Sequence, residues 1–274
     1  MAAPAEHAER NPSLVRLLDV VPELADGMSP RAAELARQTA AAAVVTVPTG
    51  VWQPDAVGAP GLLGYLIISG YLLRRVTLHG TAASELLGRG DLLGADDDPA
   101  ADGLLVTAAR WTAVGPVRLA VLDKHLLFAM ARCPQLLEPL LARGTARARC
   151  LTAITAIGHM KRIDDRLLAL FSHLGSMWGR VSPDGILLDI PLSHGQIGDI
   201  VGCERPSVTT SLGRLRARGI VKKRADRSWL LSSAIAEAAS APSAREQAKV
   251  LGAESRALMA QADQVRKGAL ELRR

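Results

Sequence analysis

The chain has 274 residues, of which 49% are hydrophobic and 22% are charged, so it is long enough for one or two globular domains and too apolar to be disordered throughout. It carries 33 lysines and arginines against 27 acidic residues, and the resulting net charge of +6 permits an anionic partner without requiring one. Its three cysteines are widely spaced, which indicates neither a disulfide framework nor a zinc site. We therefore expect a cytoplasmic protein without a metal or a cofactor.

The first 13 residues lack the cationic start and the apolar stretch of a signal peptide. The longest apolar run, residues 61–73, is closed by Arg74 and Arg75, so we expect no membrane segment.

From about residue 45 to 123, short apolar runs alternate with glycines, as in VVTVPTG, GYLIISGYLLRRV, SELLGRGDLLG and GPVRLAVLD. This spacing predicts short antiparallel strands joined by tight turns, and therefore a small β barrel or roll. Four aspartates interrupt the region, and we interpret them as a solvated turn without chemistry: Asp96, Asp97, Asp98 and Asp102.

From Pro134 to about Lys161 the pattern becomes helical, and small or apolar residues recur at steps of four and three. The residues of this seam are Leu137, Leu141, Gly144, Ala148, Leu151, Thr155 and Gly158. Such a seam is either a core stripe or the contact between two copies of the helix, and its small residues favour the second reading, a homodimer. Asp164 or Asp165 is then expected to cap a following helix.

The most informative segment is residues 192–231, LSHGQIGDIVGCERPSVTTSLGRLRARGIVKKRADRSWLL. Ser193 and Gln196 form a capping-box pair at the start of a short helix, and Gly202 ends it. Pro206 suits the first turn of a second helix, which buries one face. The opposite face of that helix is polar and carries Arg205, Ser207, Thr209, Thr210 and Arg214.

Residues 220–223 and 228–231 are predicted to pair as a hairpin, which forms a basic wing beside the two helices. Residues 193–231 contain eight arginines and lysines against three acidic residues, so most of the net charge of the chain lies here. A basic helix-turn-helix with a wing is typical of proteins that bind duplex DNA. The alternative is a winged helix that contacts protein.

The stretch IGDIVGCERPSVTTSLGRLRARGIV resembles the Crp/Fnr transcription regulators, and IISGYLLRRV and LLGRGDLLG resemble the glycine turns of their cyclic-nucleotide-binding β roll. The resemblance covers about residues 45–231. It implies an α+β fold with an N-terminal cyclic-nucleotide-binding-like β roll, a long dimerisation helix and a C-terminal winged helix-turn-helix. It also implies a homodimer that binds palindromic operators in double-stranded DNA, with RNA polymerase as a further partner.

Carried over by position, the resemblance places Arg205 at the start of the recognition helix, where arginine suits guanine. The next family position is often glutamate and is Pro206 here, so the operator of the prototype cannot be transferred. The expected base contacts are Arg205, Ser207, Thr209 and Thr210. The expected phosphate contacts are Ser193, His194, Arg214, Lys222, Lys223 and Arg224, although His194 is equally well read as a solvated residue at a helix start.

The sensor half departs from nucleotide-binding members of the family. Gly94 and Ala95 stand where those members hold ribose with glycine and glutamate, and Thr107 and Ala108 stand where an arginine and a small residue hold phosphate. A buried phosphate without a cation is poorly compensated, so we expect no ordinary cyclic-AMP binding. Arg110 lies three residues along and is expected on the other strand face.

Two cofactor readings are set aside. Three cysteines are too few for the four ligands of an iron-sulfur cluster. A haem would rest on lone histidines such as His79, for which a surface position is the simpler reading.

We divide the chain into an N-terminal helix plus β-roll sensor (1–133), a dimerisation helix (134–163), the winged helix-turn-helix (164–233) and a helical extension of open role (234–274). The expected function is a transcription regulator with an unknown effector or none. The rival is a sensor or protein-interaction adaptor whose winged helix does not read DNA. No catalytic constellation stands out, so we expect no enzyme.

Overall fold

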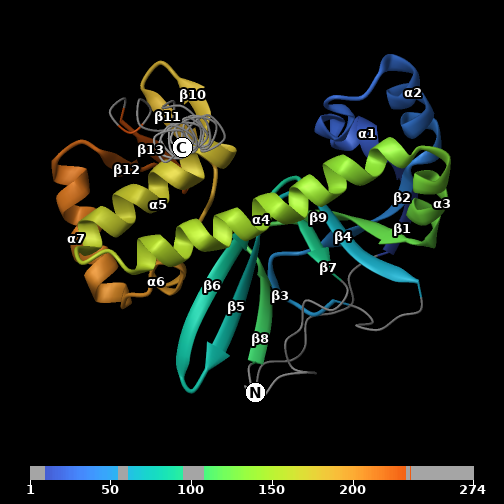
Figure 1. Cartoon of the computed structure of the whole chain (residues 1–274). Coiled ribbons are helices and arrows are strands. Elements are labelled where there is room, and N and C mark those ends of the chain that lie inside the picture. Colours follow the sequence, from blue (N-terminus) through green and yellow to red (C-terminus); the bar gives the residue numbers. More distant parts are fainter. Residues whose placement is uncertain (1–9, 55–60, 95–107, 233–234, 236–274) are drawn as a thin grey trace, which may run out of the picture.

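The computed structural model describes residues 10–54, 61–94, 108–232 and Ile235 (Figure 1). The four loop aspartates, Ala95, Thr107 and all of the C-terminal extension except Ile235 lie outside these residues. Within them, the chain forms an N-terminal β roll, one long helix and a C-terminal winged domain, which confirms the predicted α+β fold class.

The N-terminal segment adds a strand and helices to the roll. They are β1 (Arg10–Arg16), α1 (Leu17–Val20), a 3₁₀ turn (Pro22–Ala25) and α2 (Pro30–Thr39). Ser29 caps α2, since its hydroxyl accepts from the Ala32 amide at 3.3 Å. The sequence pattern did not predict β1, which forms by antiparallel pairing with β2.

The roll consists of two antiparallel sheets, ordered β1-β2-β9-β4-β7 and β3-β8-β5-β6. Its further strands are β2 (Ala41–Val47), β3 (Gly50–Trp52), β4 (Leu62–Ser69), β5 (Leu72–Leu78), β6 (Thr81–Leu87), β7 (Leu92–Gly94), β8 (Ala108–Ala113) and β9 (Val117–Asp123). The glycine turns lie where the sequence predicts them: Gly70, with φ of 86°, joins β4 to β5, and Gly90, with φ of 87°, lies between β6 and β7.

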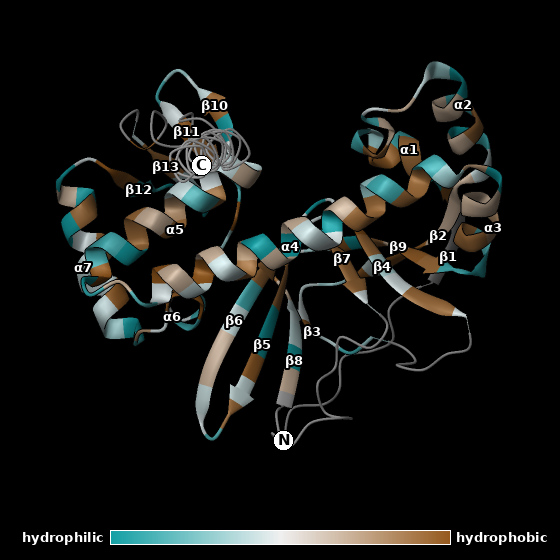
Figure 2. Cartoon of the chain, in the orientation of Figure 1, coloured by the Kyte–Doolittle hydropathy of each residue, from teal (hydrophilic) through white to brown (hydrophobic). Residues whose placement is uncertain are grey.

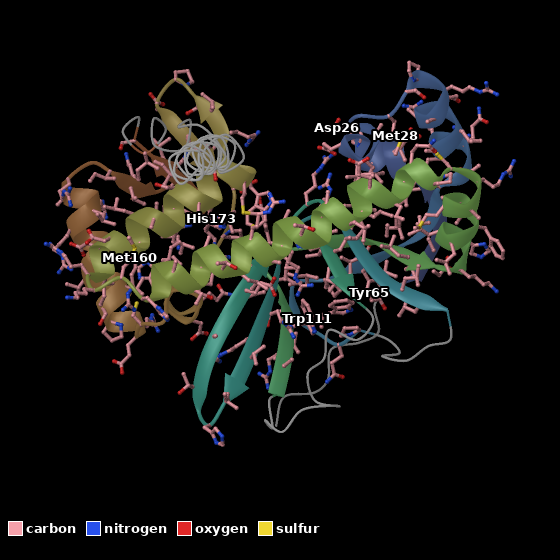
Figure 3. The ribbon with its side chains drawn as sticks, viewed as in Figure 1. Asp26, Met28, Tyr65, Trp111, Met160 and His173 are labelled. Atoms are coloured by element: carbon pink, nitrogen blue, oxygen red, sulfur yellow. The ribbon has the colours of Figure 1, made fainter. Side chains whose placement is uncertain are left out.

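Aromatic side chains pack inside the roll. Trp52 is in edge contact with Tyr65 and with Trp111, at centroid distances of 5.5 and 6.3 Å. All three residues are buried, and Figure 3 shows Tyr65 and Trp111 within the roll beneath the long helix. This part of the roll interior is therefore filled by the side chains of the protein itself.

After α3 (Lys124–Arg132) and a 3₁₀ turn (Pro134–Leu136), the long helix α4 (Leu137–Gly158) crosses the whole molecule, with the roll and the C-terminal domain packed along it (Figure 1). Arg147 binds the Glu85 carboxylate through two nitrogens, at 2.7 and 3.0 Å, and donates to the Leu92 carbonyl. Arg143 donates to the Gly90 carbonyl at 3.2 Å. This face of α4 is thus tied to the roll.

The other face of α4 is open. Leu137, Leu141 and Leu151 expose 46%, 62% and 40% of their surface, and Gly144, Ala148 and Thr155 beside them are also exposed. Gly158 is half-buried at the end of the helix. Figure 2 shows hydrophobic and hydrophilic residues mixed along α4, as expected for a helix with apolar residues on two faces.

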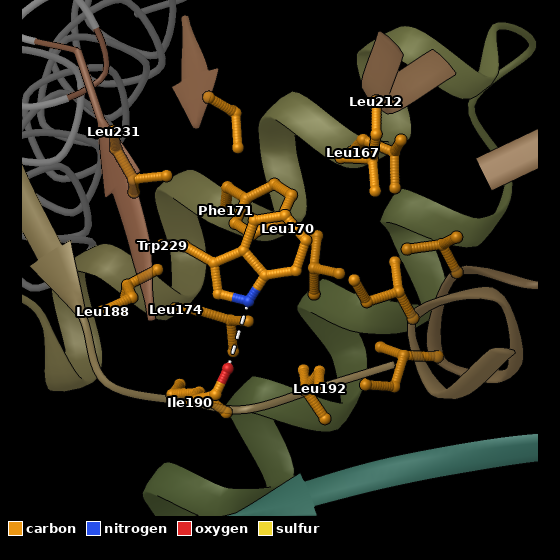
Figure 4. Close-up of a cluster of buried hydrophobic side chains, with 14 of the residues drawn as sticks. Leu167, Leu170, Phe171, Leu174, Leu188, Ile190, Leu192, Leu212, Trp229 and Leu231 are labelled. Carbon is orange, nitrogen blue, oxygen red and sulfur yellow. Dashed lines mark hydrogen bonds between the residues drawn. The ribbon is translucent and has the colours of Figure 1, made fainter. Parts of the chain in front are cut away.

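The C-terminal domain packs helices against a small sheet ordered β10-β11-β13-β12. Its elements are α5 (Ile163–Trp178), β10 (Arg180–Ser182), β11 (Gly185–Leu188), α6 (His194–Val201), α7 (Arg205–Ala217), β12 (Val221–Lys223) and β13 (Trp229–Leu231). In its core, Phe171 packs on Trp229 at 5.1 Å, and the Trp229 indole donates to the Ile190 carbonyl at 3.1 Å (Figure 4).

The roll and the C-terminal domain share one hydrophobic core. Leu73 and Val114 of the roll belong to the same buried cluster as the apolar residues of α5, α6 and α7. Tyr71 stacks edge-on against Trp178 at 5.4 Å, and Arg75 on β5 pairs with Asp199 on α6 at 3.3 Å. The position of α6 is thereby defined by the β5–β6 hairpin as well as by its own domain.

One expectation about α5 is wrong. The helix begins at Ile163 after Arg162, which occupies the N-cap position without a side-chain cap bond, so neither Asp164 nor Asp165 is the cap. Both carboxylates lie in the first turn, where the helix dipole favours negative charge. Asp164 is buried, and its partners lie on α7.

Candidate nucleic-acid interface

The first helix of the pair begins and ends as its sequence predicts. The Ser193 hydroxyl accepts from the Gln196 amide at 3.2 Å, and the Ser193 amide donates to the Gln196 side chain at 2.8 Å, which completes a capping box. Gly202 ends the helix in the left-handed region, with φ of 68°. This fixes the turn that leads into α7.

Helix α7 begins at Arg205, and Pro206 lies in its first turn, where a missing amide hydrogen costs little. Val208, Leu212 and Leu215 are buried, as the sequence predicts. On the outer side, Arg205, Thr209 and Thr210 are exposed and Ser207 is half-buried. The four predicted base contacts thus have surface that a groove can reach.

His194 connects the start of α6 to α7. Its Nδ1 lies 2.9 Å from the Thr209 hydroxyl, and that hydroxyl donates to the Arg205 carbonyl at 3.0 Å. Burial lowers the pKa of His194, and the charges of Lys223 and Arg205 lower it further. The imidazole therefore lies where α6, α7 and the wing meet. The Thr209 hydroxyl is therefore engaged within the domain, although the residue is exposed.

The wing is the hairpin of β12 and β13. Its turn closes with Arg227 in the left-handed region, at φ of 69°, and the Arg224 amide donates to the Ser228 carbonyl at 2.9 Å. Lys222, Lys223 and Arg224 are exposed. The hairpin thus carries cations at the edge of the domain.

Lys223 is held more firmly than a free surface lysine. Its ammonium lies 4.8 Å from the centre of the Trp229 ring and 3.3 Å from the Leu192 carbonyl. Burial lowers its pKa, and the neighbouring Arg227 lowers it further. The contacts with Trp229 and Leu192 therefore restrict the conformations of the Lys223 side chain.

Arg214 has an intramolecular partner that the sequence did not reveal. Two of its guanidinium nitrogens bind the Asp164 carboxylate at 2.6 and 3.0 Å, and its side chain remains 55% exposed. The Ser211 hydroxyl, fully buried one turn earlier, donates to the same carboxylate. The hydrogen bond from Arg214, followed by that from Ser211, lowers the pKa of Asp164 from 3.8 to about 2.

Arg110 lies on β8, three residues beyond Thr107, the predicted phosphate position. That residue is exposed on β8 opposite Arg75, while the adjacent Trp111 is buried. His79 is exposed in the turn between β5 and β6. Among the described residues, the cysteines are free thiols and no cluster of three histidine, cysteine or acidic side chains is arranged to hold a metal.

In the described residues, one long helix joins a β roll to a winged helix-turn-helix. The comparisons with known proteins agree: residues 161–232 match the family model of the Crp-like helix-turn-helix domain. The C-terminal domain is thus a Crp-like helix-turn-helix, and the chain has the architecture of the Crp/Fnr regulators.

Solved structures share this fold at low sequence identity. A mutant of CooA from Carboxydothermus hydrogenoformans is 17% identical with a TM-score of 0.57, covering 82% of this chain and 96% of its own. A cyclic nucleotide-binding domain containing protein from Listeria monocytogenes EGD-e is 14% identical with a TM-score of 0.59, covering 80% of this chain and 99% of its own. FixK2 from Bradyrhizobium japonicum is 16% identical with a TM-score of 0.54, covering 69% and 92%.

The comparison with curated proteins finds no match. In the part of the chain that the structure describes, no helix has the length and apolar character needed to cross a bilayer.

Proposed function

We propose that this chain is a sequence-specific, DNA-binding transcription regulator that acts in the cytoplasm as a homodimer on a palindromic operator and is not controlled by cyclic AMP. The observation that carries the proposal is the convergence at His194. There the capped start of α6, the exposed N-terminal turn of α7 and the basic wing lie together in a Crp-like domain. This combination suits a duplex with its phosphates along both sides of a groove.

The contacts divide into two kinds. Arg205, Ser207, Thr209 and Thr210 face base edges, with arginine suited to guanine and the Thr209 methyl group to thymine. Ser193, His194, Arg214, Lys222, Lys223 and Arg224 contact phosphates and set the register of the domain on the duplex. Phosphate raises the pKa of His194 from its lowered value, so binding favours the protonated ring.

The homodimer forms along the open face of α4. Its exposed leucines stand at the spacing of the seam, and the small residues between them allow two helices to approach closely. The opposite face is already occupied by the roll through Arg143 and Arg147. A two-fold axis along α4 places one recognition helix on each side, which matches a palindromic site.

The sensor acts without cyclic AMP. The aromatic side chains that fill part of the roll and the outward position of Arg110 both argue against a buried cyclic phosphate. The effector is a different compound or none. RNA polymerase is the expected protein partner, and the chain acts as a regulator and not as an enzyme.

The test is selection of duplexes from a random pool by the purified full chain, followed by binding titrations with the enriched sequence and a scrambled one. We expect enrichment of an inverted repeat with half-sites about one helical turn apart. If no sequence is enriched and binding to all duplexes is equally weak, the proposal fails and the protein-interaction adaptor replaces it.

A further inference from the structure

We propose that Asp164 is a positioning residue that fixes the angle between the recognition helix α7 and the helices that connect it to α4, and thereby the half-site spacing that the protein accepts. This inference rests on the proposed function. Asp164 touches no nucleic acid in this scheme. It acts through Ser211 and Arg214, which are on the recognition helix itself.

The position of Asp164 in the chain is the first part of the argument. Helix α4 ends at Gly158, α5 begins at Ile163, and Asp164 lies in the first turn of α5. Any rotation of α5 about this connection therefore moves Asp164 directly. Arg166, also in this turn, donates to the Val201 and Gly202 carbonyls at 3.1 Å, so the end of α6 is attached to the same point.

The quality of the bonds is the second part. The Asp164 residue is 8% exposed and Ser211 is fully buried, so their hydrogen bond lies away from water, where loss of one partner leaves a polar group unsatisfied. Arg214 binds both oxygens of the carboxylate through two nitrogens, a geometry that fixes direction as well as distance. Apolar packing of α7 through Val208, Leu212 and Leu215 resists separation of the helices but not a small rotation.

The third part of the argument is the effect of the α7 angle on the spacing of the two recognition helices. In a dimer, the two recognition helices must enter successive major grooves about 34 Å apart, so a small change in the angle of each α7 alters the spacing of both. Base preference within one half-site depends on side chains of the outer face and is separate from this angle. Loss of the Asp164 bonds should thus affect spacing more than half-site sequence.

The experiment compares Asp164→Asn with Asp165→Asn. Asp165 lies in the same turn, is exposed, and among the described residues forms an ion pair with Arg162 at 4.0 Å, so the control removes an equal charge from the same helix end. Binding of each full-length variant is measured on duplexes with the selected half-sites at the preferred spacing and at spacings one or two base pairs shorter or longer, and on a single half-site.

We expect the wild type and Asp165→Asn to discriminate against the altered spacings equally. In Asp164→Asn, the ratio of the affinity at the preferred spacing to that at the altered spacings should fall about tenfold, while the half-site sequence preference stays within about twofold of wild type. Ser211→Ala keeps the Arg214 ion pair and should give an intermediate loss. If Asp164→Asn binds with the wild-type spacing preference, or loses affinity for all duplexes in the same proportion, the inference is wrong.

A measurement without DNA separates this inference from the proposed function. Amide hydrogen exchange in free Asp164→Asn should be about tenfold faster in α7 than in wild type, and that of Asp165→Asn should be unchanged. If the wild type binds no duplex, the proposed function fails whatever the exchange data show. If α7 exchanges at the wild-type rate in Asp164→Asn and Ser211→Ala, the anchoring role of Asp164 fails on its own. If Asp164→Asn does not fold, Ser211→Ala decides both measurements.

Discussion

Replacing Leu141 and Leu151 together by glutamate should convert the protein into monomers. Both residues lie on the open face of α4, with 62% and 40% of their surface exposed in one protomer. Full burial of a leucine is worth about 1.5 to 3 kcal/mol, so covering these exposed fractions contributes roughly 1.5 to 3 kcal/mol per protomer and about twice that per dimer. Glutamate removes this contribution and adds charge repulsion across the two-fold axis.

At about 1.4 kcal/mol per factor of ten, the dimer dissociation constant should rise at least about a hundredfold. The assay is light scattering and sedimentation equilibrium over a range of protein concentrations, with 29.0 kDa as the monomer mass. Because the replaced side chains are exposed in the protomer, thermal unfolding of the variant should remain cooperative.

Leu14 and Leu63 provide a matched control, since they are 71% and 41% exposed but lie on β1 and β4. Their double replacement by glutamate should leave the dimer intact. A Leu141/Leu151 variant that remains dimeric at the dilutions where wild type does, or a control that dissociates equally, would refute the seam as the interface.

Three further predictions concern DNA, effector and pH. Arg205→Ala should cost about 1 to 3 kcal/mol of binding free energy on the operator and relax the base preference at one position per half-site. Replacing Lys222 and Lys223 by alanine should instead weaken binding to all duplexes alike and reduce the slope of log affinity against log salt by about one unit for each phosphate that is no longer neutralised. Equal losses on operator and scrambled duplex for Arg205→Ala would reject its base-reading role. Calorimetric titration should detect no saturable micromolar binding of cyclic AMP, and a signal that tracks DNA affinity would overturn this. Burial raises the pKa of Asp91 from 3.8 to about 6, so its contribution to stability is full below pH 3.8 and is lost as pH rises through 6. The unfolding temperature of Asp91→Asn should therefore exceed that of wild type near pH 7, and the difference should disappear near pH 4. A difference that does not change with pH would contradict the raised pKa of Asp91.

Local signals predicted the helix-turn-helix well. The Ser193 capping box, the left-handed Gly202 and Pro206 in the first turn each act within a few residues, so they can be read without tertiary information. The family match over residues 161–232 confirms the type of domain. The individual DNA contacts stay predictions.

Tertiary pairing explains what the sequence could not reveal. Adjacent Asp164 and Asp165 look alike at a helix start, yet only Asp164 faces α7, 47 residues further along, through Ser211. The ion pair of Arg214 with the same carboxylate explains why Arg214 does not project freely from the polar face of its helix. Strand β1 was missed for a similar reason, because its partner β2 begins only at Ala41, after the intervening helices.

Because Leu73 and Val114 share a core with the C-terminal helices, the two domains of this protein are poorly suited to exchange with domains of other proteins. Cutting the chain between α4 and α5 would leave Trp178 without Tyr71 and Asp199 without Arg75, and would expose apolar surface on both pieces. A chimera that joins this winged domain to an unrelated sensor would therefore need to bring the β5–β6 hairpin with it to remain soluble.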